Sequence, residues 1–318
     1  MATPPASVIT IDCHYEGPEK ASAYLIIEDG RAAFVDNNTV HAVPHLLRAV
    51  TEHGLTPEQV DYAIITHVHL DHAGGSAALL KACPNATLLA HPKAARHMID
   101  PARLIAGSKV VYGEEAFREL YGEIEPVPAE RVRTMEDGEC LDWGTRTFRL
   151  FYTLGHASHH FCIYDSGSNG VFTGDSFGIG RTSHVRPGAS FLVCSSTPVE
   201  FDGPEAHKAV DQIVATGAAW AYVGHYGSFE RLPECARQLH RSIDQHEAIL
   251  KAALAESGDE TALQTFCEPR VRAALEDHLR WVGVEDAEDD LAWIGGDVAL
   301  NAQGLVAAVV RARRKRAT

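Results

Sequence analysis

The feature that most constrains this chain is a dense run of potential metal ligands directly after an apolar segment. Residues 62–66 form a continuous apolar run with turn signals before it, which is typical of a strand buried on both faces. The run leads into His67, His69, Asp71 and His72, four ligand-type side chains within six residues. Burying them without a cation or hydrogen-bond partners would be costly. The segment therefore predicts a metal site, with a hydrogen-bonded histidine cluster as the alternative.

Three later positions repeat this arrangement of a ligand-type side chain after a strand-like run. His156, Asp175 and His225 each follow an apolar segment, and glycine stands directly before Asp175 and before His225. Glycine permits tight turns and close approach of the backbone. Strand ends are also where rigid scaffolds commonly place active residues. The three positions therefore strengthen the prediction of a metal site.

Composition and charge narrow the class of protein. The chain has 318 residues and a formal net charge of −15, which disfavours binding to nucleic acid and to anionic membranes. No apolar run approaches the roughly 18–20 residues that span a bilayer. The first residues show no signal-peptide pattern, so we expect a cytoplasmic location. The basic run at residues 311–316 is interpreted as a frayed, solvated end rather than a nucleic-acid arm. Seven widely spaced cysteines argue against a disulfide scaffold.

The hydrophobic patterns divide the chain into two parts. Residues 1–228 alternate short strand-like runs with helical segments such as residues 41–53, as expected for a mixed α/β domain. Residues 229–318 are mainly helical, with long helical patterns at residues 232–254 and 269–281. The apolar run at residues 304–310 fits either a strand or a helix.

The ordered motifs resemble those of the metallo-β-lactamase-fold hydrolases, over roughly residues 6–227. The motifs are His-x-His-x-Asp-His, then a lone histidine after glycine, then Gly-Asp, and finally Gly-His. The resemblance implies the α+β class and an αββα sandwich, in which two mixed sheets pack face to face between helices. It also implies that the site lies at one edge of the sandwich.

The resemblance implies a role for each ligand. One divalent ion would be bound by His67, His69 and His156, a second by Asp71, His72 and His225, and Asp175 would bridge both. Zinc suits this mixed set of imidazoles and carboxylates, and iron or manganese suits it nearly as well because the set is not metal-selective.

The implied chemistry is the activation of water. In two-metal sites a bound water loses its proton near neutral pH, and the metal-bound hydroxide attacks the substrate. Asp71 is expected to orient this nucleophile and to accept its proton. Tyr226 follows a ligand and is a candidate oxyanion donor, although ordinary packing explains a tyrosine there equally well.

Five further side chains are secondary candidates for the site. His159 and His160 follow a ligand closely and would serve either as groups that orient ligands or as structural histidines. His97, Tyr112 and His184 are candidates for the pocket wall, with surface or packing roles as the commoner outcome.

The expected activity is hydrolysis of an ester, thioester or lactone bond in a small molecule, similar to glyoxalase II and related enzymes. One alternative is a mononuclear-iron oxidoreductase similar to the persulfide dioxygenases, and another is a non-catalytic metal-binding protein. The complete set of seven ligands argues against both alternatives. The C-terminal helices would either close over the site or support a homodimer, and the sequence does not decide between them.

Overall fold

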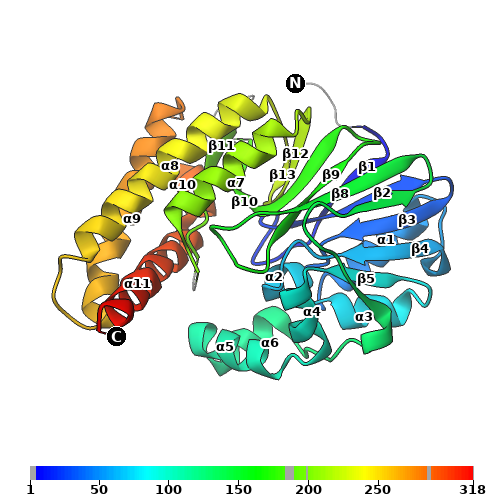
Figure 1. Ribbon diagram of the computed structural model, residues 1–318, viewed down its shortest axis with the longest axis horizontal. Coiled ribbons are helices and arrows are strands. Elements are labelled where there is room, and N and C mark those ends of the chain that lie inside the picture. The colour runs from blue at the N-terminus through cyan, green and yellow to red at the C-terminus, as the bar shows by residue number, and fades with distance from the viewer. Residues whose placement is uncertain (1–4, 183–189, 198–199, 285–287, 318) are drawn as a thin grey trace.

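Two mixed β-sheets pack face to face and carry helices on their outer faces, which confirms the predicted αββα sandwich (Figure 1). The computed structural model describes residues 5–182, 190–197, 200–284 and 288–317. The first sheet has the strand order β1-β2-β3-β4-β5-β6. The second has the order β13-β12-β10-β9-β8-β7, and β11 pairs with β10.

The strands of the first sheet come from the N-terminal part of the chain, and those of the second follow them. The first sheet contains β1 (Val8–Asp12), β2 (Ser22–Glu28), β3 (Arg31–Val35), β4 (Val60–Ile64), β5 (Thr87–Ala90) and β6 (Val132–Thr134). The second contains β7 (Cys140–Trp143), β8 (Arg146–Tyr152), β9 (Phe161–Asp165), β10 (Gly170–Thr182), β11 (Ser190–Val193), β12 (Trp220–His225) and β13 (Gly227–Glu230).

The helices divide between the two outer layers and a short helix at the site. The N-terminal part contains α1 (Val43–Glu52), α2 (Leu70–Ala73), α3 (Ser76–Ala82), α4 (Pro92–Ile99), α5 (Ala102–Tyr112) and α6 (Glu114–Tyr121). The C-terminal part contains α7 (Gly203–Ala215), α8 (Leu232–Ala253), α9 (Glu260–Trp281), α10 (Glu288–Trp293) and α11 (Gly295–Ala317). Short 3₁₀ turns occupy Pro57–Gln59 and Ala129–Arg131.

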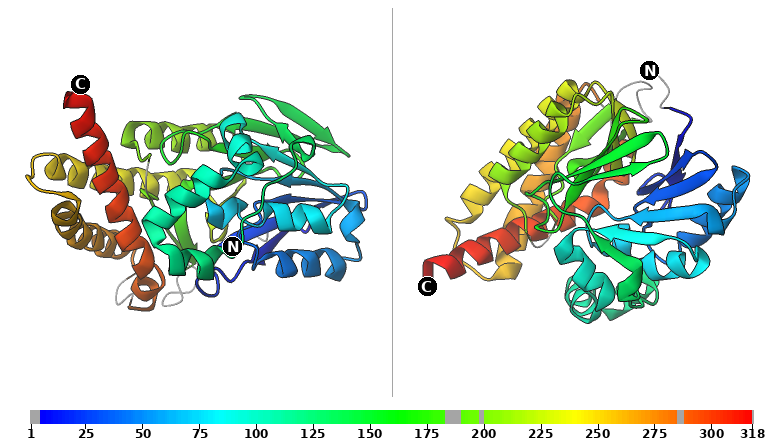
Figure 2. Two further views of the ribbon diagram at one scale, coloured as in Figure 1. Left: turned by 90° about the horizontal axis from the view of Figure 1, so that it is seen from below. Right: turned by 45° about the vertical axis from the view of Figure 1, so that its right-hand side comes forward.

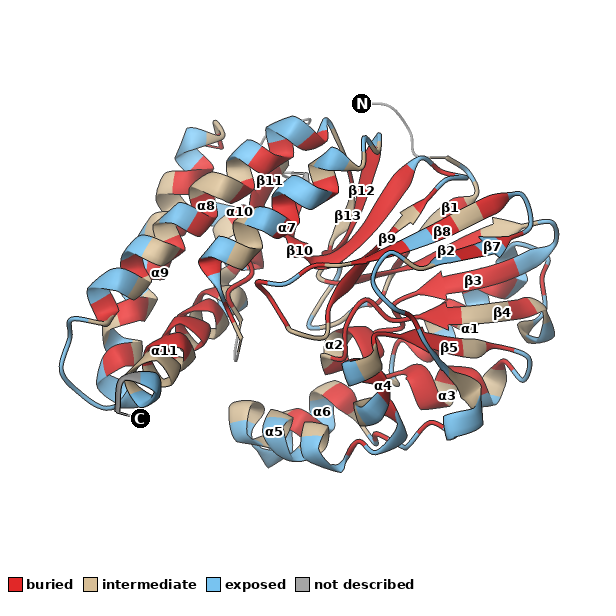
Figure 3. Ribbon diagram, in the orientation of Figure 1, coloured by how far each residue is buried: buried red, intermediate tan, exposed pale blue. Residues whose placement is uncertain are grey.

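The alternation of side chains along β3 shows how the layers are held together. Ala33 and Val35 face the core between the sheets, whereas Ala32 and Phe34 face the core under the outer helices. Successive side chains of a strand point to opposite faces, so an apolar strand such as β3 contributes to two cores at once. Figure 3 accordingly colours most of β3 as buried.

The C-terminal helices pack on the outer face of the second sheet and share one core with it. The predicted division at residues 228/229 falls within β13, directly before α8. Figure 2 shows the C-terminal helices gathered on one side of the sandwich. Residues 304–310 belong to helix α11. By length and composition the segment Glu288–Lys315 could cross a membrane, but 56% of its most apolar window is buried in the fold, as in a core helix.

The expected start of the second long C-terminal helix is wrong. The helical pattern of residues 269–281 predicted that this helix begins at Pro269. In the structure α9 begins at Glu260 and contains Pro269 in its interior. The Asp259 side chain caps the helix by accepting a hydrogen bond from the Ala262 N–H. Leu263 and Cys267, in the early turns of α9, are buried in the core. This packing outweighs the free-energy cost of a proline inside the helix.

Candidate metal centre

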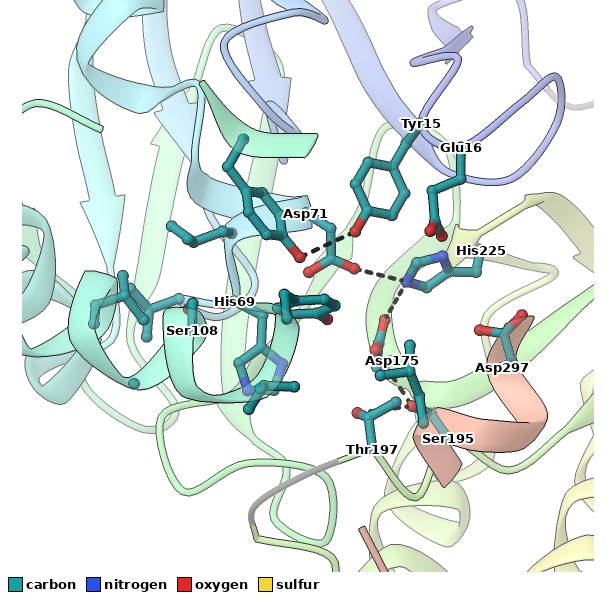
Figure 4. Close-up of a pocket in the computed structure, with 18 of the residues that line it drawn as sticks. Tyr15, Glu16, His69, Asp71, Ser108, Asp175, Ser195, Thr197, His225 and Asp297 are labelled. Atoms are coloured by element: carbon teal, nitrogen blue, oxygen red, sulfur yellow. Dashed lines mark hydrogen bonds and ion pairs between the residues drawn. The ribbon is translucent and has the colours of Figure 1, made fainter. Parts of the chain in front are cut away.

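The seven predicted ligands meet at one edge of the sandwich, although they come from four separate segments. The chain bends after β4 at His67, and His69 then directly precedes the short helix α2, which carries Asp71 and His72. The other three ligands lie in the β8–β9 loop, on β10 and at the end of β12; they are His156, Asp175 and His225. Several of them face one cavity in Figure 4.

Three histidines form the first ligand cluster. The Nδ1 atom of His69 lies 3.0 Å from Nε2 of His67 and 3.0 Å from Nε2 of His156. One oxygen of Asp175, Oδ2, lies 3.5 Å from Nε2 of His156. An ion about 2.0–2.2 Å from each donor would place neighbouring donors roughly 3.4 Å apart in a tetrahedral site. The cluster therefore fits the coordination of one ion.

Two histidines and two aspartates form the second ligand cluster. The Oδ2 atom of Asp71 lies 3.3 Å from Nε2 of His225 and 3.6 Å from Nε2 of His72. The other oxygen of Asp175, Oδ1, lies 3.1 Å from Nε2 of His72 and 3.5 Å from Nε2 of His225. Asp175 thus presents one oxygen to each cluster, which is the geometry of a bridging ligand.

Two buried atoms of the second cluster provide an independent test of whether these residues fit metal ions. His72 Nε2 and Asp175 Oδ1 are shielded from solvent and face each other at 3.1 Å, and neither has a satisfied hydrogen bond to another described residue. Buried polar atoms without partners are rare, because each costs free energy. A cation placed between the two atoms would satisfy both, so the donor set fits a metal centre.

The electrostatics differ between the two clusters. Burial lowers the pKa of His67 well below its usual range, and the neighbouring imidazoles lower it further. Burial also opposes a charge on His72, but Asp175, Asp71 and Asp36 outweigh it and hold the pKa of His72 well above its usual range. The first cluster therefore presents neutral imidazoles, whereas the carboxylates of the second cluster favour positive charge at their centre.

Asp36, which lies directly after β3, supports the site although it was not among the predicted residues. Its carboxylate accepts a hydrogen bond from Nδ1 of His72 at 2.9 Å and two from Thr66, one from the backbone N–H and one from the hydroxyl. The Thr66 hydroxyl lies 3.1 Å from Nδ1 of His67. Such outer partners fix which ring nitrogen faces a metal. Asp36 therefore orients a ligand of each cluster, and a charged residue that ends an apolar strand was the only signal in the sequence.

Two further contacts orient the remaining histidines. Nδ1 of His225 donates to the Lys20 carbonyl at 3.0 Å, which leaves Nε2 to face the second cluster. The Ser195 hydroxyl lies 3.4 Å from Nδ1 of His156 and 3.4 Å from Oδ2 of Asp175. Ser195 follows β11, so the outer edge of the second sheet also supports the site.

Two glycines leave the space that the ligands occupy. A Cβ atom at Gly224 would lie 2.5 Å from the His72 ring and 3.2 Å from Asp175 Oδ1. Gly174 has a φ of +45°, and a Cβ there would lie 2.5 Å from the His160 ring. These close approaches are the kind that glycine permits, and they occur directly before Asp175 and His225.

A cavity of about 290 Å³ opens over the second cluster. Its walls include His97 and Tyr112, as the sequence analysis considered, together with His159. The hydroxyls of Tyr15 and Tyr121 also lie in the wall, 3.0 Å apart. The C-terminal helices contribute a further part of the wall, which consists of Trp293, Asp297 and Leu300.

Three candidates from the sequence do not lie in this wall or cannot be placed. The Tyr226 side chain packs against the core under the C-terminal helices and is not among the residues that line the cavity. His160 is fully buried; its Nδ1 bonds the Thr153 hydroxyl at 2.8 Å, and its Nε2 accepts from the Asp175 N–H at 3.3 Å. His160 is therefore a structural histidine that holds the bridging residue. His184 lies outside the described residues.

Comparison with known proteins gives relatives of several activities. The protein ST1585 of Sulfurisphaera tokodaii, named as metallo-beta-lactamase fold-containing, is 26% identical over 167 residues, or 51% of this chain and 59% of the relative. A hydroxyacylglutathione hydrolase of Aeromonas hydrophila is 28% identical over 132 residues, or 41% of this chain and 39% of the relative. An atrochrysone carboxyl ACP thioesterase of Aspergillus fumigatus is 22% identical over 180 residues, or 57% and 42%. The chain thus spans about half the length of these relatives.

The fold and the family are supported over most of the chain. The solved structure of the archaeal protein ST1585 from Sulfolobus tokodaii covers 95% of this chain and is itself covered to 99%, with a TM-score of 0.63 and 20% identity. The family model described as the metallo-beta-lactamase superfamily matches residues 17–225, which include all seven ligands. With the sandwich, the ordered ligands and this match in agreement, the chain belongs to the metallo-beta-lactamase superfamily.

Proposed function

We propose that this protein is a dinuclear metal hydrolase that cleaves an ester, thioester or lactone bond in a small molecule. The observation that carries the proposal is the position of Asp175, whose two oxygens face two separate ligand clusters. A mononuclear enzyme needs only one of these clusters. Zinc suits both donor sets, and iron or manganese suits the same donors.

The residues around the clusters have distinct tasks in such a reaction. Divalent ions bound there would lower the pKa of water and polarise a substrate carbonyl. The Asp71 carboxylate faces the cavity beside His225, where it is placed to orient the attacking water and to take its proton. Asp36, through His72 and Thr66, keeps the ligand nitrogens turned toward the centre.

The cavity favours a small substrate with an apolar part. Its volume of about 290 Å³ lies near the lower end of the range for small-molecule pockets. Apolar side chains line much of the wall, among them Leu70, Leu104, Val111, Ile179 and Leu300. Tyr15 and Tyr121 add hydroxyls that can donate to a polar group of the substrate. These features support an acyl compound rather than a polymer.

The relatives support hydrolysis as the reaction class. Two of them are named as a hydroxyacylglutathione hydrolase and a thioesterase, and both names describe the cleavage of an acyl compound. The matches cover less than half of either relative, so the choice among thioesters, esters and lactones belongs to the proposal.

The test combines metal content with a substrate panel. Thioesters, lactones and aryl esters would be offered to the zinc-, iron- and manganese-loaded protein, and turnover of at least one class that a chelator abolishes is expected. Asp71→Asn, which keeps the shape of the side chain, is expected to remove turnover and leave the far-ultraviolet circular dichroism unchanged. Unchanged turnover in this variant, or no turnover of any class by fully loaded protein, would contradict the proposal.

A further inference from the structure

A second group of histidines and carboxylates lies outside the wall of the cavity, between helices α7 and α8. We call it the α7–α8 cluster. On α8 it contains three side chains at helical spacings of four and three residues, so that they share one face. On α7 it contains two side chains four residues apart. The members are His207 and Asp211 of α7, and His240, Asp244 and Glu247 of α8.

Three members have the spacing of metal ligands. Nε2 of His207 lies 3.3 Å from Oδ1 of Asp244 and 3.8 Å from Oε2 of Glu247. Ligand atoms of all three residues lie within 4.8 Å of one another. Donors about 2.0–2.2 Å from a shared zinc ion would be roughly 3.4 Å apart in a tetrahedral site. The two distances from the imidazole are close to this value without rearrangement.

Hydrogen bonds on the far side of the His207 ring orient it toward the two carboxylates. Nε2 of His240 lies 3.1 Å from Oδ1 of Asp211, which can only accept, so this nitrogen carries a proton. In a neutral ring, Nδ1 of His240 is then an acceptor, and it lies 2.6 Å from Nδ1 of His207, which must donate. When Nδ1 of His207 donates in this way, its Nε2 faces the two carboxylates as an acceptor, which is the form of the ring that binds a metal ion. A metal ion bound to Nε2 of His207 would need no additional proton on either His207 or His240.

The α7–α8 cluster has space for a cation and carries negative charge that can attract one. A Cβ atom at Gly203 would lie 2.3 Å from Oε1 of Glu247, so the glycine in the first turn of α7 makes space for this carboxylate. In the described part of the chain, the ion pairs of Asp244 and Glu247 go to His207 and to no lysine or arginine. The nearby Lys208 pairs with Glu205 instead. The cluster thus retains an excess of negative charge.

We propose that His207, Asp244 and Glu247 bind one divalent transition-metal ion of the zinc type, with water completing its coordination, and that His240 and Asp211 orient the imidazole ligand. The ion would connect α8, the first helix of the C-terminal part, to α7. The start of α7 also contacts a loop of the metal centre. The N–H of Asp202, which caps α7, donates to the carbonyl of Gly155, the residue before His156, at 2.9 Å. The site is nevertheless structural, because none of its members lines the cavity.

The test counts metal in the full-length protein. Wild type and the double variant Asp244→Asn/Glu247→Gln would be equilibrated with micromolar free zinc, desalted and analysed for metal per chain. The variant is expected to hold one zinc fewer than wild type and to keep wild-type turnover. The matched control is Glu205→Gln/Glu234→Gln, which removes two charges from the same helices where each carboxylate pairs with a basic neighbour. The control is expected to keep the wild-type count.

A second variant tests the outer hydrogen bonds and covers a double variant that fails to fold. His240→Gln leaves all three ligands in place and is expected to weaken zinc binding at this site by about 10–100-fold, measured by competition with a chromophoric chelator. Equal zinc counts in wild type and the double variant would overturn the proposal, as would an equal loss in the control. An unchanged affinity in His240→Gln would overturn the proposed proton arrangement. These outcomes do not depend on turnover, so they are separable from a failure of the proposed hydrolase activity.

Discussion

The metal centre and the α7–α8 cluster use the same side chains in opposite settings. In the centre, His72 and Asp175 are almost fully buried, and outer partners such as Asp36 are buried with them. In the α7–α8 cluster the Asp244 side chain is 71% exposed and that of Glu247 is 36% exposed. Ligands on strand ends and loops inside a sandwich are fixed by packing, whereas ligands on two helix faces depend on how those helices meet.

The two sites differ in whether water can replace a hydrogen-bond partner that a substitution removes. A buried donor that loses its partner retains the cost of its desolvation, whereas an exposed one regains hydrogen bonds from solvent. Equivalent substitutions should therefore cost more in the metal centre than in the α7–α8 cluster.

The largest effect is expected from Asp175→Ala, which removes the carboxylate that faces both ligand clusters. Turnover should fall by more than the ~10²–10³-fold that the loss of a single oxyanion donor costs. The metal content of the centre should fall with it, because each cluster loses an oxygen. Steady-state kinetics with metal analysis would show both effects. If the contrast holds, the zinc of the α7–α8 cluster stays bound, and simultaneous loss of all metal would contradict the independence of the two sites.

His278 is a buried histidine outside both clusters, so it tests how strongly burial alone resists a charge on an imidazole. Burial, helped by the charge of Arg241, lowers the pKa of His278 from its ordinary value of 6.5 to about 4. The unfolded chain therefore binds a proton at higher pH than the folded chain. The free energy of unfolding should fall as the pH drops from about 6.5 to about 4, by about 3 kcal/mol in total.

The contribution of His278 can be separated from that of other groups by substitution. In His278→Leu the extra loss of stability between pH 6.5 and pH 4 should disappear, and urea unfolding at several pH values would measure it. A parallel pH dependence in wild type and variant would show that this imidazole does not resist protonation.

A matched pair of outer carboxylates provides the next test. Asp36→Ala is expected to weaken metal binding at the centre by about 10–100-fold, because His72 loses the acceptor that orients its ring. Asp211→Ala removes the equivalent acceptor of His240, but the Asp211 side chain is 72% exposed and water can replace it. Competition with a chelator would rank the two variants. Equal losses of metal affinity in the two variants would contradict the proposal that a buried outer carboxylate matters more than an exposed one.

A matched pair of glycines is expected to give the smallest effects. Gly224→Ala places a Cβ against the His72 ring, which Asp36 holds in place, so we expect a loss of about 1–3 kcal/mol in stability. The nearest atoms that Gly203→Ala would meet belong to the partly exposed side chain of Glu247, which can rotate away, so thermal unfolding of the metal-free protein should change less. A larger loss for Gly203→Ala than for Gly224→Ala would reverse the comparison.

The sequence predicted more of the site than of its surroundings. The seven ligands were found because their order and spacing match a family motif, and the structure brings all seven together. Asp36 was missed because one carboxylate at a strand end has no spacing partner in the sequence. Tyr226 was a candidate because it follows a ligand, yet its side chain packs into a core while its neighbour His225 faces the metal centre.

The helical part was the least predictable from local patterns. The helical spacing of His240, Asp244 and Glu247 is visible in the sequence, but His207 lies 33 residues before His240 and reaches them only because α7 packs on α8. The start of α9 was predicted incorrectly because tertiary contacts stabilise turns that proline disfavours. Likewise, the contribution of Trp293 to the cavity follows from the packing of the C-terminal helices.

The αββα class and the seven candidate ligands could be predicted from the sequence alone, because strand periodicity and a family motif are local properties of the chain. Only the tertiary structure decided which oxygen of Asp175 faces which cluster, which carboxylate orients His72, and which distant helices complete the cavity wall. Spacing along the chain fixes which side chains share a strand end or a helix face, because these relations involve only neighbouring residues. Contacts between segments depend on how whole layers pack, and that packing is a property of the complete fold.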